Sequence, residues 1–232
     1  VARQSVAAGQ RDRAVGVEFT VKHQGHSHKV FLKDTVGSQH VYSVCAALAV
    51  ASELGADVTK AVEALSTLRT PNGRMRLVPG IKSTTLIDDT YNSSPIAAES
   101  ALQALNEIKY SNRRIAVLGD MLELGKFSSK EHVRIGSIAA ECTDILITVG
   151  VRARQIAEGA VNHGLSEKNV YQYDDVARAG RELQVMLQPG DVVLVKSSQS
   201  IRAERIVEEV MADPELASEL LVRQDPTWKG IA

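Results

Sequence analysis

Residues 115–120 read IAVLGD, an apolar, β-branched run that ends in a glycine and an acid. Similar runs are TTLIDD at 84–89 and ILITVG at 145–150, and a fourth, VVLVK at 192–196, ends in a lysine. Helical patterns at 96–108, 130–140 and 151–162 separate these runs, and a weaker strand at 169–173 precedes helical patterns at 175–187 and 201–211. This alternation predicts an α/β domain, with helices on both faces of a mostly parallel sheet of about five or six strands.

The first seventy residues follow a different pattern. Residues 15–22 and 29–32 alternate apolar and polar side chains around HQGH at 23–26, which predicts an antiparallel hairpin. Two helices are expected, at 41–54 and 58–68, before the sequence TPNG at 70–73. That proline and glycine predict a domain boundary between residues 1–69 and 70–232. A hairpin with two helices makes a small core, and the chain begins at Val1 rather than Met, so we expect further residues upstream.

Composition excludes several classes of protein. Of the 232 residues, 44% are hydrophobic and 24% are charged, as in folded globular proteins. The net charge of -1 provides no basic surface for nucleic acid, and 4% aromatic residues provide few platforms for stacking bases. No run approaches the roughly 18 apolar residues of a membrane span. Cys45 and Cys142 lack metal-ligand or CxxC spacing, which predicts free thiols in a cytoplasmic protein.

The loops that follow the predicted strands carry the polar residues of interest. Open parallel sheets bind ligands at the carboxyl ends of their strands, where helix N-termini present unpaired N–H groups. The loop DDTYNSSP at 88–95 has more polar groups than helix capping needs, and GDMLELG at 119–125 follows the next strand. GRMR at 73–76 lies at the predicted boundary, where an arginine can bind phosphate. A helix cap, a glycine-flanked turn and solvated arginines are the plainer alternatives, and for Lys196 we favour a simple strand end.

The histidines do not predict a metal site. His23, His26 and His28 lie at the expected hairpin tip, where solvated side chains are the favoured interpretation. His132 begins a helix and, taken alone, indicates a surface or capping residue. The sequence also contains neither GxxxxGK[ST] nor GxGxxG.

Taken together, the two strand-end loops resemble one family. DDTYNSSP at 88–95 is similar to the DD-[ST]-YN-x-x-P signature of the Mur ligases that add D-alanyl-D-alanine, and VLGDMLELG at 117–125 matches their segment at every position. His132 and Gly136 fit the H-x-x-x-G that follows, and GRM at 73–75 resembles the opening of their C-terminal domain. The resemblance covers essentially the whole chain. It implies that residues 1–69 end a central ATPase α/β domain and that residues 70–232 form a Rossmann-like C-terminal domain.

The resemblance implies an ATP-dependent ligase of peptidoglycan synthesis that is cytoplasmic and monomeric. Such an enzyme phosphorylates the terminal carboxylate of UDP-N-acetylmuramoyl-tripeptide, and the amine of D-Ala-D-Ala attacks the acyl phosphate. ATP and Mg²⁺ are the implied cofactors. The phosphate loop, the metal ligands and the activating lysine are expected upstream of Val1. We therefore expect no catalytic residue and no metal ligand within this chain, and no activity from the chain alone.

Individual site residues are also implied by the resemblance. Arg74 would contact the phosphate or adenine of ATP, Asp89 the ribose, and Asn92 the junction of nucleotide and dipeptide. The implied nucleotide-binding set is Arg74, Asp89, Asn92 and His40, and the implied substrate-binding set is Asn92, Ser93, Asp120, Glu123 and His132. As surface-loop changes, Asp89→Ala and Asn92→Ala are expected to abolish ligation and to alter stability by less than about 1 kcal/mol.

The sequence departs from the family pattern at two loops. In GSQHVYS at 37–43, Gln39, His40 and Ser43 replace the His, Asn and Asn of G-x-H-N-V-x-N. In KSSQ at 196–199, Ser197 and Gln199 replace the Gly and Arg of K-G-S-R. These departures keep open a non-catalytic nucleotide- or peptide-binding module of the same fold. A sibling Mur ligase that adds a single amino acid is the other alternative, against which the GDMLELG loop argues.

Overall fold

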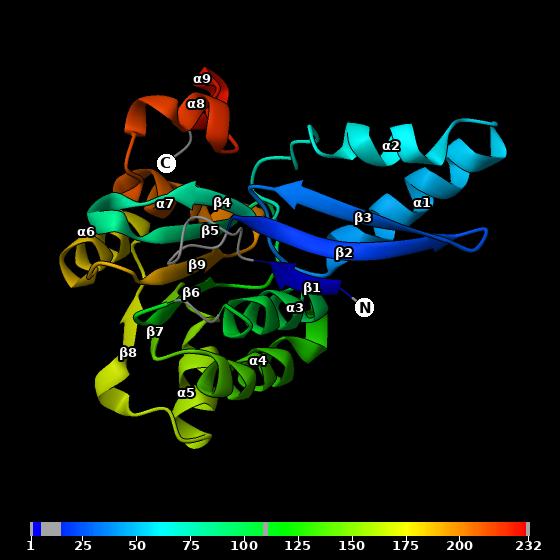
Figure 1. Ribbon diagram of the computed structural model, residues 1–232. Helices are drawn as coiled ribbons and strands as arrows, with labels where there is room; N and C mark the ends of the chain where they lie inside the picture. The colour runs from blue at the N-terminus through cyan, green and yellow to red at the C-terminus, as the bar shows by residue number, and fades with distance from the viewer. Residues whose placement is uncertain (1, 6–14, 109–110, 231–232) are drawn as a thin grey trace.

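The computed structural model describes residues 2–5, 15–108 and 111–230, which contain two β-sheets (Figure 1). The smaller sheet is antiparallel, in the order β1-β2-β3, and two helices accompany it. Its elements are β1 (Ala2–Ser5), β2 (Gly16–His23), β3 (His26–Lys33), α1 (Gln39–Glu53) and α2 (Val58–Leu65). The predicted hairpin and both predicted helices are confirmed, whereas β1 was not predicted.

The larger sheet has six strands in the order β4-β5-β9-β6-β7-β8. Five of them run parallel, and β4 pairs antiparallel with β5 at the edge. The strands are β4 (Arg76–Pro79), β5 (Thr85–Asp89), β6 (Arg114–Gly119), β7 (Ile145–Val149), β8 (Val170–Tyr173) and β9 (Val192–Lys196). The predicted α/β fold with a mostly parallel sheet is confirmed.

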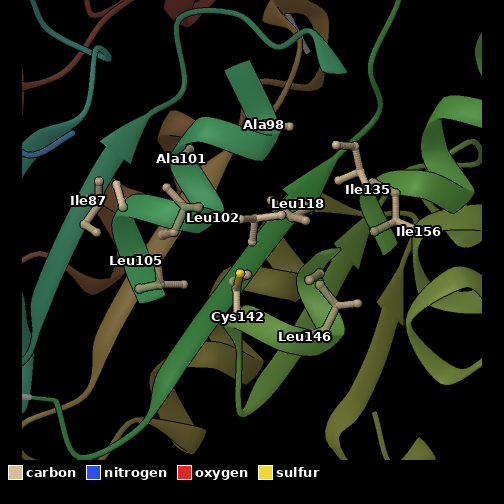
Figure 2. Close-up of a cluster of buried hydrophobic side chains, with 14 of the residues drawn as sticks. Ile87, Ala98, Ala101, Leu102, Leu105, Leu118, Ile135, Cys142, Leu146 and Ile156 are labelled. Carbon is tan, nitrogen blue, oxygen red and sulfur yellow. The ribbon is translucent and has the colours of Figure 1, made fainter. Parts of the chain in front are cut away.

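Helices cover both faces of the larger sheet. They are α3 (Pro95–Asn106), α4 (Ser128–Cys142) and α5 (Arg154–Asn162) on one face, and α6 (Val176–Met186) and α7 (Glu204–Val210) on the other. Two short helices, α8 (Ala217–Leu220) and α9 (Pro226–Lys229), follow α7. Figure 2 shows one face, where Leu102 of α3 and Ile135 of α4 pack near Leu118 of β6. Burying each such side chain contributes roughly 1.5–3 kcal/mol. Among the described residues, no helix has the length and apolar character that crossing a membrane requires.

The strand order brings three loops together at one edge of the sheet. In the register of the sheet, Asp89 of β5 lies opposite Lys196 of β9, and Lys196 lies opposite Leu118 of β6. Because these strands are parallel neighbours, the loops that follow all three emerge side by side at the carboxyl ends. The fold therefore gathers the loops 88–95, 119–125 and 197–203 in one place.

The two sheets meet where the end of β3 lies near the larger sheet (Figure 1). The Val36 N–H donates to the Met75 carbonyl at 3.1 Å, and the Leu77 N–H donates to the Asp34 carbonyl at 2.9 Å. These bonds place the segment before α1 directly beside the segment that opens the larger sheet.

Candidate functional site

Asp88 anchors the loop that follows β5. Its side chain is fully buried, and one carboxylate oxygen accepts from the Thr90 hydroxyl at 2.6 Å and the Thr90 N–H at 3.2 Å. The other oxygen accepts from the Gly73 N–H at 3.1 Å. Burial raises the pKa of the Asp88 carboxyl from 3.8 to about 6, although these hydrogen bonds lower it. Asp88 thus connects the 73–75 segment to the start of the loop through hydrogen bonds.

The raised pKa of Asp88 predicts a pH-dependent stability. The folded state binds this proton more tightly than the unfolded state, so the contribution of Asp88 is present at low pH and lost as pH rises through about 6. Between pH 7 and pH 5, the free energy of unfolding of the wild type should rise by roughly 1 kcal/mol relative to Asp88→Asn. Urea unfolding of both proteins across this range measures the difference. Parallel pH curves would show that Asp88 does not titrate there.

Lys196 is a buried partner of Asp89. Its side chain is 2% exposed, and its ammonium donates to Asp89 Oδ2 at 2.6 Å and to the Asn92 carbonyl at 2.9 Å. The other carboxylate oxygen of Asp89 accepts from the Met75 N–H at 3.2 Å. The sequence interpretation of Lys196 as a simple strand end therefore missed a buried ion pair that holds two strand-end loops together.

His40, a candidate for nucleotide binding, belongs to the same network. The Thr35 hydroxyl donates its single proton to the Met75 carbonyl at 3.0 Å, so the contact of 2.9 Å between Thr35 Oγ1 and His40 Nε2 is donated by the histidine. Burial lowers the pKa of His40, and the nearby charge of Asp89 raises it. His40 is therefore linked to Asp89 through Thr35 and Met75.

Arg74 lies beside the same loop. Its exposed guanidinium lies over the Tyr91 ring, 4.2 Å from the ring centroid, and the Tyr91 N–H donates to the Gly73 carbonyl at 3.1 Å. A cation over an aromatic face is a modest attraction of about 0.5–1 kcal/mol at an exposed site. The arrangement offers a cation and a ring at the surface, next to the buried Asp89–Lys196 pair.

A cavity of about 550 Å³ opens where the three loops meet. Polar neutral side chains dominate its wall, with one acid, one arginine and a few apolar groups. The lining residues are Asn92, Ser93, Ser94, Leu122, Glu123, Leu124, Ser198, Gln199, Ser200, Arg202 and Trp228. Of the predicted substrate-binding residues, Asn92, Ser93 and Glu123 are brought together here.

Asp120 and His132 lie behind this wall. Asp120 Oδ1 accepts from the Ala153 N–H at 2.7 Å, and the residue is 4% exposed. His132 is fully buried, and its Nε2 accepts from the Met121 N–H at 3.0 Å, so its Nδ1 carries the proton and donates to the Ser128 carbonyl at 2.7 Å. Both side chains shape the loop at 119–125 and do not line the cavity.

The residues that depart from the family pattern fall in different places. Gln199 lines the cavity, and Ser197 is buried against Gly119, where an added Cβ would lie 2.6 Å from the serine Cβ. Gln39 is half-buried, and among the described residues its Oε1 has no hydrogen-bond partner. Ser43 is exposed on α1.

The carboxylates of this site do not suit Mg²⁺. In the described parts of the chain, no group of three or more His, Cys, Asp or Glu side chains is arranged to hold a metal ion. Asp88 and Asp89 instead accept from backbone, hydroxyl and ammonium donors. Two candidates for nucleotide binding have exposed side chains: Arg74 lies beside the loop at 88–95, and Asn92 lies within it.

The sequence and the fold are similar to those of known proteins. Residues 73–199 match the family described as "Mur ligase, glutamate ligase domain". The UDP-N-acetylmuramoyl-tripeptide–D-alanyl-D-alanine ligase of Bacillus subtilis is 29% identical over 86% of this chain and 43% of its own length. The enzyme of the same name from Mycobacterium leprae is 33% identical over 76% of this chain and 37% of its own length.

A solved structure has a similar fold. The MurF ligase from Thermotoga maritima, crystallised in complex with ADP, has a TM-score of 0.72 and 26% identity over 85% of this chain and 43% of that chain. The present chain thus spans about two fifths of the length of the relatives that it matches.

Proposed function

The chain belongs to the Mur ligase family, and from this premise we propose that it is the acceptor-side part of an ATP-dependent ligase. The ligase joins D-Ala-D-Ala to UDP-N-acetylmuramoyl-tripeptide through an acyl phosphate in peptidoglycan synthesis, in the cytoplasm and as a monomer. One observation carries the proposal. The two loops with the family motifs, at 88–95 and 119–125, both contribute to the wall of one polar cavity at the carboxyl ends of β5 and β6.

Residues 1–69 are proposed to be the end of the central ATPase domain, and residues 70–232 the C-terminal domain. The character of α1 supports this division, because the helix has no charged residue before Glu53 and exposes large apolar side chains. Tyr42 and Val50 on the helix are 79% and 60% exposed, and Leu54, which directly follows the helix, is 81% exposed. A further part of the same domain would cover such a face.

The cavity suits a small zwitterionic acceptor. The exposed carboxylate of Glu123 attracts an ammonium group, while the Asn92 amide and the neighbouring hydroxyls donate to a carboxylate. On the nucleotide side, the Arg74–Tyr91 pair offers a cation and a ring. ATP, when bound, supplies the phosphoryl group that activates the tripeptide carboxylate. The role of this chain is to orient the acceptor amine and to exclude water that would hydrolyse the acyl phosphate.

The identity of the product tests the proposal. The full-length enzyme is incubated with ATP, Mg²⁺, either UDP-N-acetylmuramoyl-tripeptide or one of its shorter precursors, and either D-Ala-D-Ala or single amino acids, and the products are identified by mass spectrometry. We expect the mass of the pentapeptide product, with D-Ala-D-Ala as the acceptor. A product that carries one added amino acid would identify a sibling ligase. Nucleotide binding without any product would identify a binding module.

A further inference from the structure

A buried cluster of charges lies next to the cavity. Arg202, Glu204 and Arg223 are 5%, 0% and 9% exposed. Glu204 Oε1 accepts from Arg202 Nε at 2.6 Å, and its Oε2 accepts from Arg223 Nη2 at 3.0 Å. One carboxylate thus joins a residue that follows β9 to a residue near the C-terminal end of the chain.

Arg223 extends this cluster to the loop after β5. Its Nη2 also donates to the Thr90 carbonyl, and its Nη1 donates to the Tyr91 carbonyl at 3.3 Å. These two carbonyls lie between Asp89 and Asn92, so a guanidinium that is 132 residues away in sequence holds the middle of the loop. Lys196 holds the next carbonyl, that of Asn92. Three successive carbonyls of the loop are therefore bound by buried cations.

The same cluster holds a wall of the cavity. Arg202 Nη1 donates to the Trp228 carbonyl at 2.8 Å, and the guanidinium carbons of Arg202 and Arg223 lie 5.3 and 5.9 Å from the centroid of the Trp228 ring. Trp228 lines the cavity together with Asn92. We name Arg202, Glu204, Arg223 and Trp228 the C-terminal clamp.

We propose that Arg223 is a positioning residue for the ligation, which sets the Thr90–Asn92 backbone so that the Asn92 side chain faces the acceptor cavity. A buried ion cluster is an expensive way to stabilise a fold, because its desolvation offsets most of its attraction. Here the directional hydrogen bonds of the guanidinium end on a loop that lines the cavity. Planar, forked donors fix such carbonyls in a way that a single ammonium does not. The inference rests on the proposed function.

Two variants separate positioning from stability in the full-length enzyme. Arg223→Met removes all of the donors but leaves Glu204 paired with Arg202. Arg223→Lys keeps a positive charge beside Glu204 and loses the fork. We expect kcat to fall about tenfold in both variants, because a misplaced loop lowers the rate without removing a reacting group. The melting temperature should fall in Arg223→Met and recover in Arg223→Lys. Lys229→Met, an exposed change in the same segment, should behave as the wild type.

Hydrogen exchange gives a second readout that does not depend on turnover. In both Arg223 variants, amides of residues 90–94 should exchange faster, while those of β6 and β7 stay unchanged. Recovery of both kcat and loop exchange in Arg223→Lys would overturn the inference, since charge alone would then suffice. A wild-type enzyme without dipeptide-dependent turnover would overturn the proposed function and this inference with it. An active wild type with equally active Arg223 variants would overturn this inference alone.

Discussion

Replacing Lys196 by Met is expected to lower the free energy of unfolding by about 3–5 kcal/mol, the usual cost of leaving one partner of a buried ion pair uncompensated. Lys196 and Asp89 are 2% and 8% exposed at their side chains, and their charged atoms lie 2.6 Å apart. The Asn92 carbonyl would also lose a donor. Urea unfolding of this chain at pH 7 measures the effect.

Two further variants make that prediction specific. The double variant Lys196→Met/Asp89→Asn should be less destabilised than Lys196→Met, because the unpaired buried charge is gone. Lys130→Met, which removes an exposed lysine, should stay within about 0.5 kcal/mol of the wild type. Equal losses in the single and double variants would show that the ion pair is not the cause. The ion pair also corrects the expectation for Asp89→Ala. This substitution should lower the free energy of unfolding by more than about 1 kcal/mol, because the buried charge of Lys196 would lose its partner.

Asn92→Ala is expected to lower kcat/KM for D-Ala-D-Ala by about 100-fold in the full-length enzyme, the usual effect of removing one preorganised hydrogen-bonding group. The Asn92 side chain is exposed and lines the cavity, and it is the carbonyl, kept in the variant, that accepts from Lys196. Stability should therefore change by less than about 1 kcal/mol. Steady-state kinetics at saturating ATP, with thermal unfolding alongside, measure both quantities.

A matched control for Asn92→Ala is available on the following helix. Ile96 is 79% exposed and does not line the cavity, so Ile96→Ala should keep the parental kcat/KM. Unchanged dipeptide kinetics in Asn92→Ala would remove Asn92 from the acceptor site. A similar loss of activity in both variants would point to a general disturbance of the loop and α3.

The sequence predicts the strands that are buried on both faces. Stretches such as 115–118 and 145–149 are continuous apolar runs, without alternation, because helices cover both sides of the sheet. The edge strand β4 was missed, since it has four residues, ends in Pro79 and precedes Gly80, which together resemble a turn. Pro79 is compatible with the edge position of an antiparallel strand.

The candidate site was predictable in part. Loop motifs placed Asn92, Ser93 and Glu123 at the strand ends, and the structure brings them to one cavity. The C-terminal clamp had no sequence signal, because Arg223 meets the loop across 132 residues and such pairs leave no local pattern. The ion pair of Lys196 was not predictable for the same reason, since its partner Asp89 lies 107 residues away in the sequence.

Phosphate release by the full-length enzyme tests the central claim most directly. The assay contains ATP, Mg²⁺ and UDP-N-acetylmuramoyl-tripeptide, and it is run with and without D-Ala-D-Ala. We predict sustained release of phosphate that requires the dipeptide, because the acyl phosphate is consumed only when the acceptor amine attacks it. A folded enzyme that binds nucleotide and releases phosphate at the same rate without the dipeptide would contradict the account.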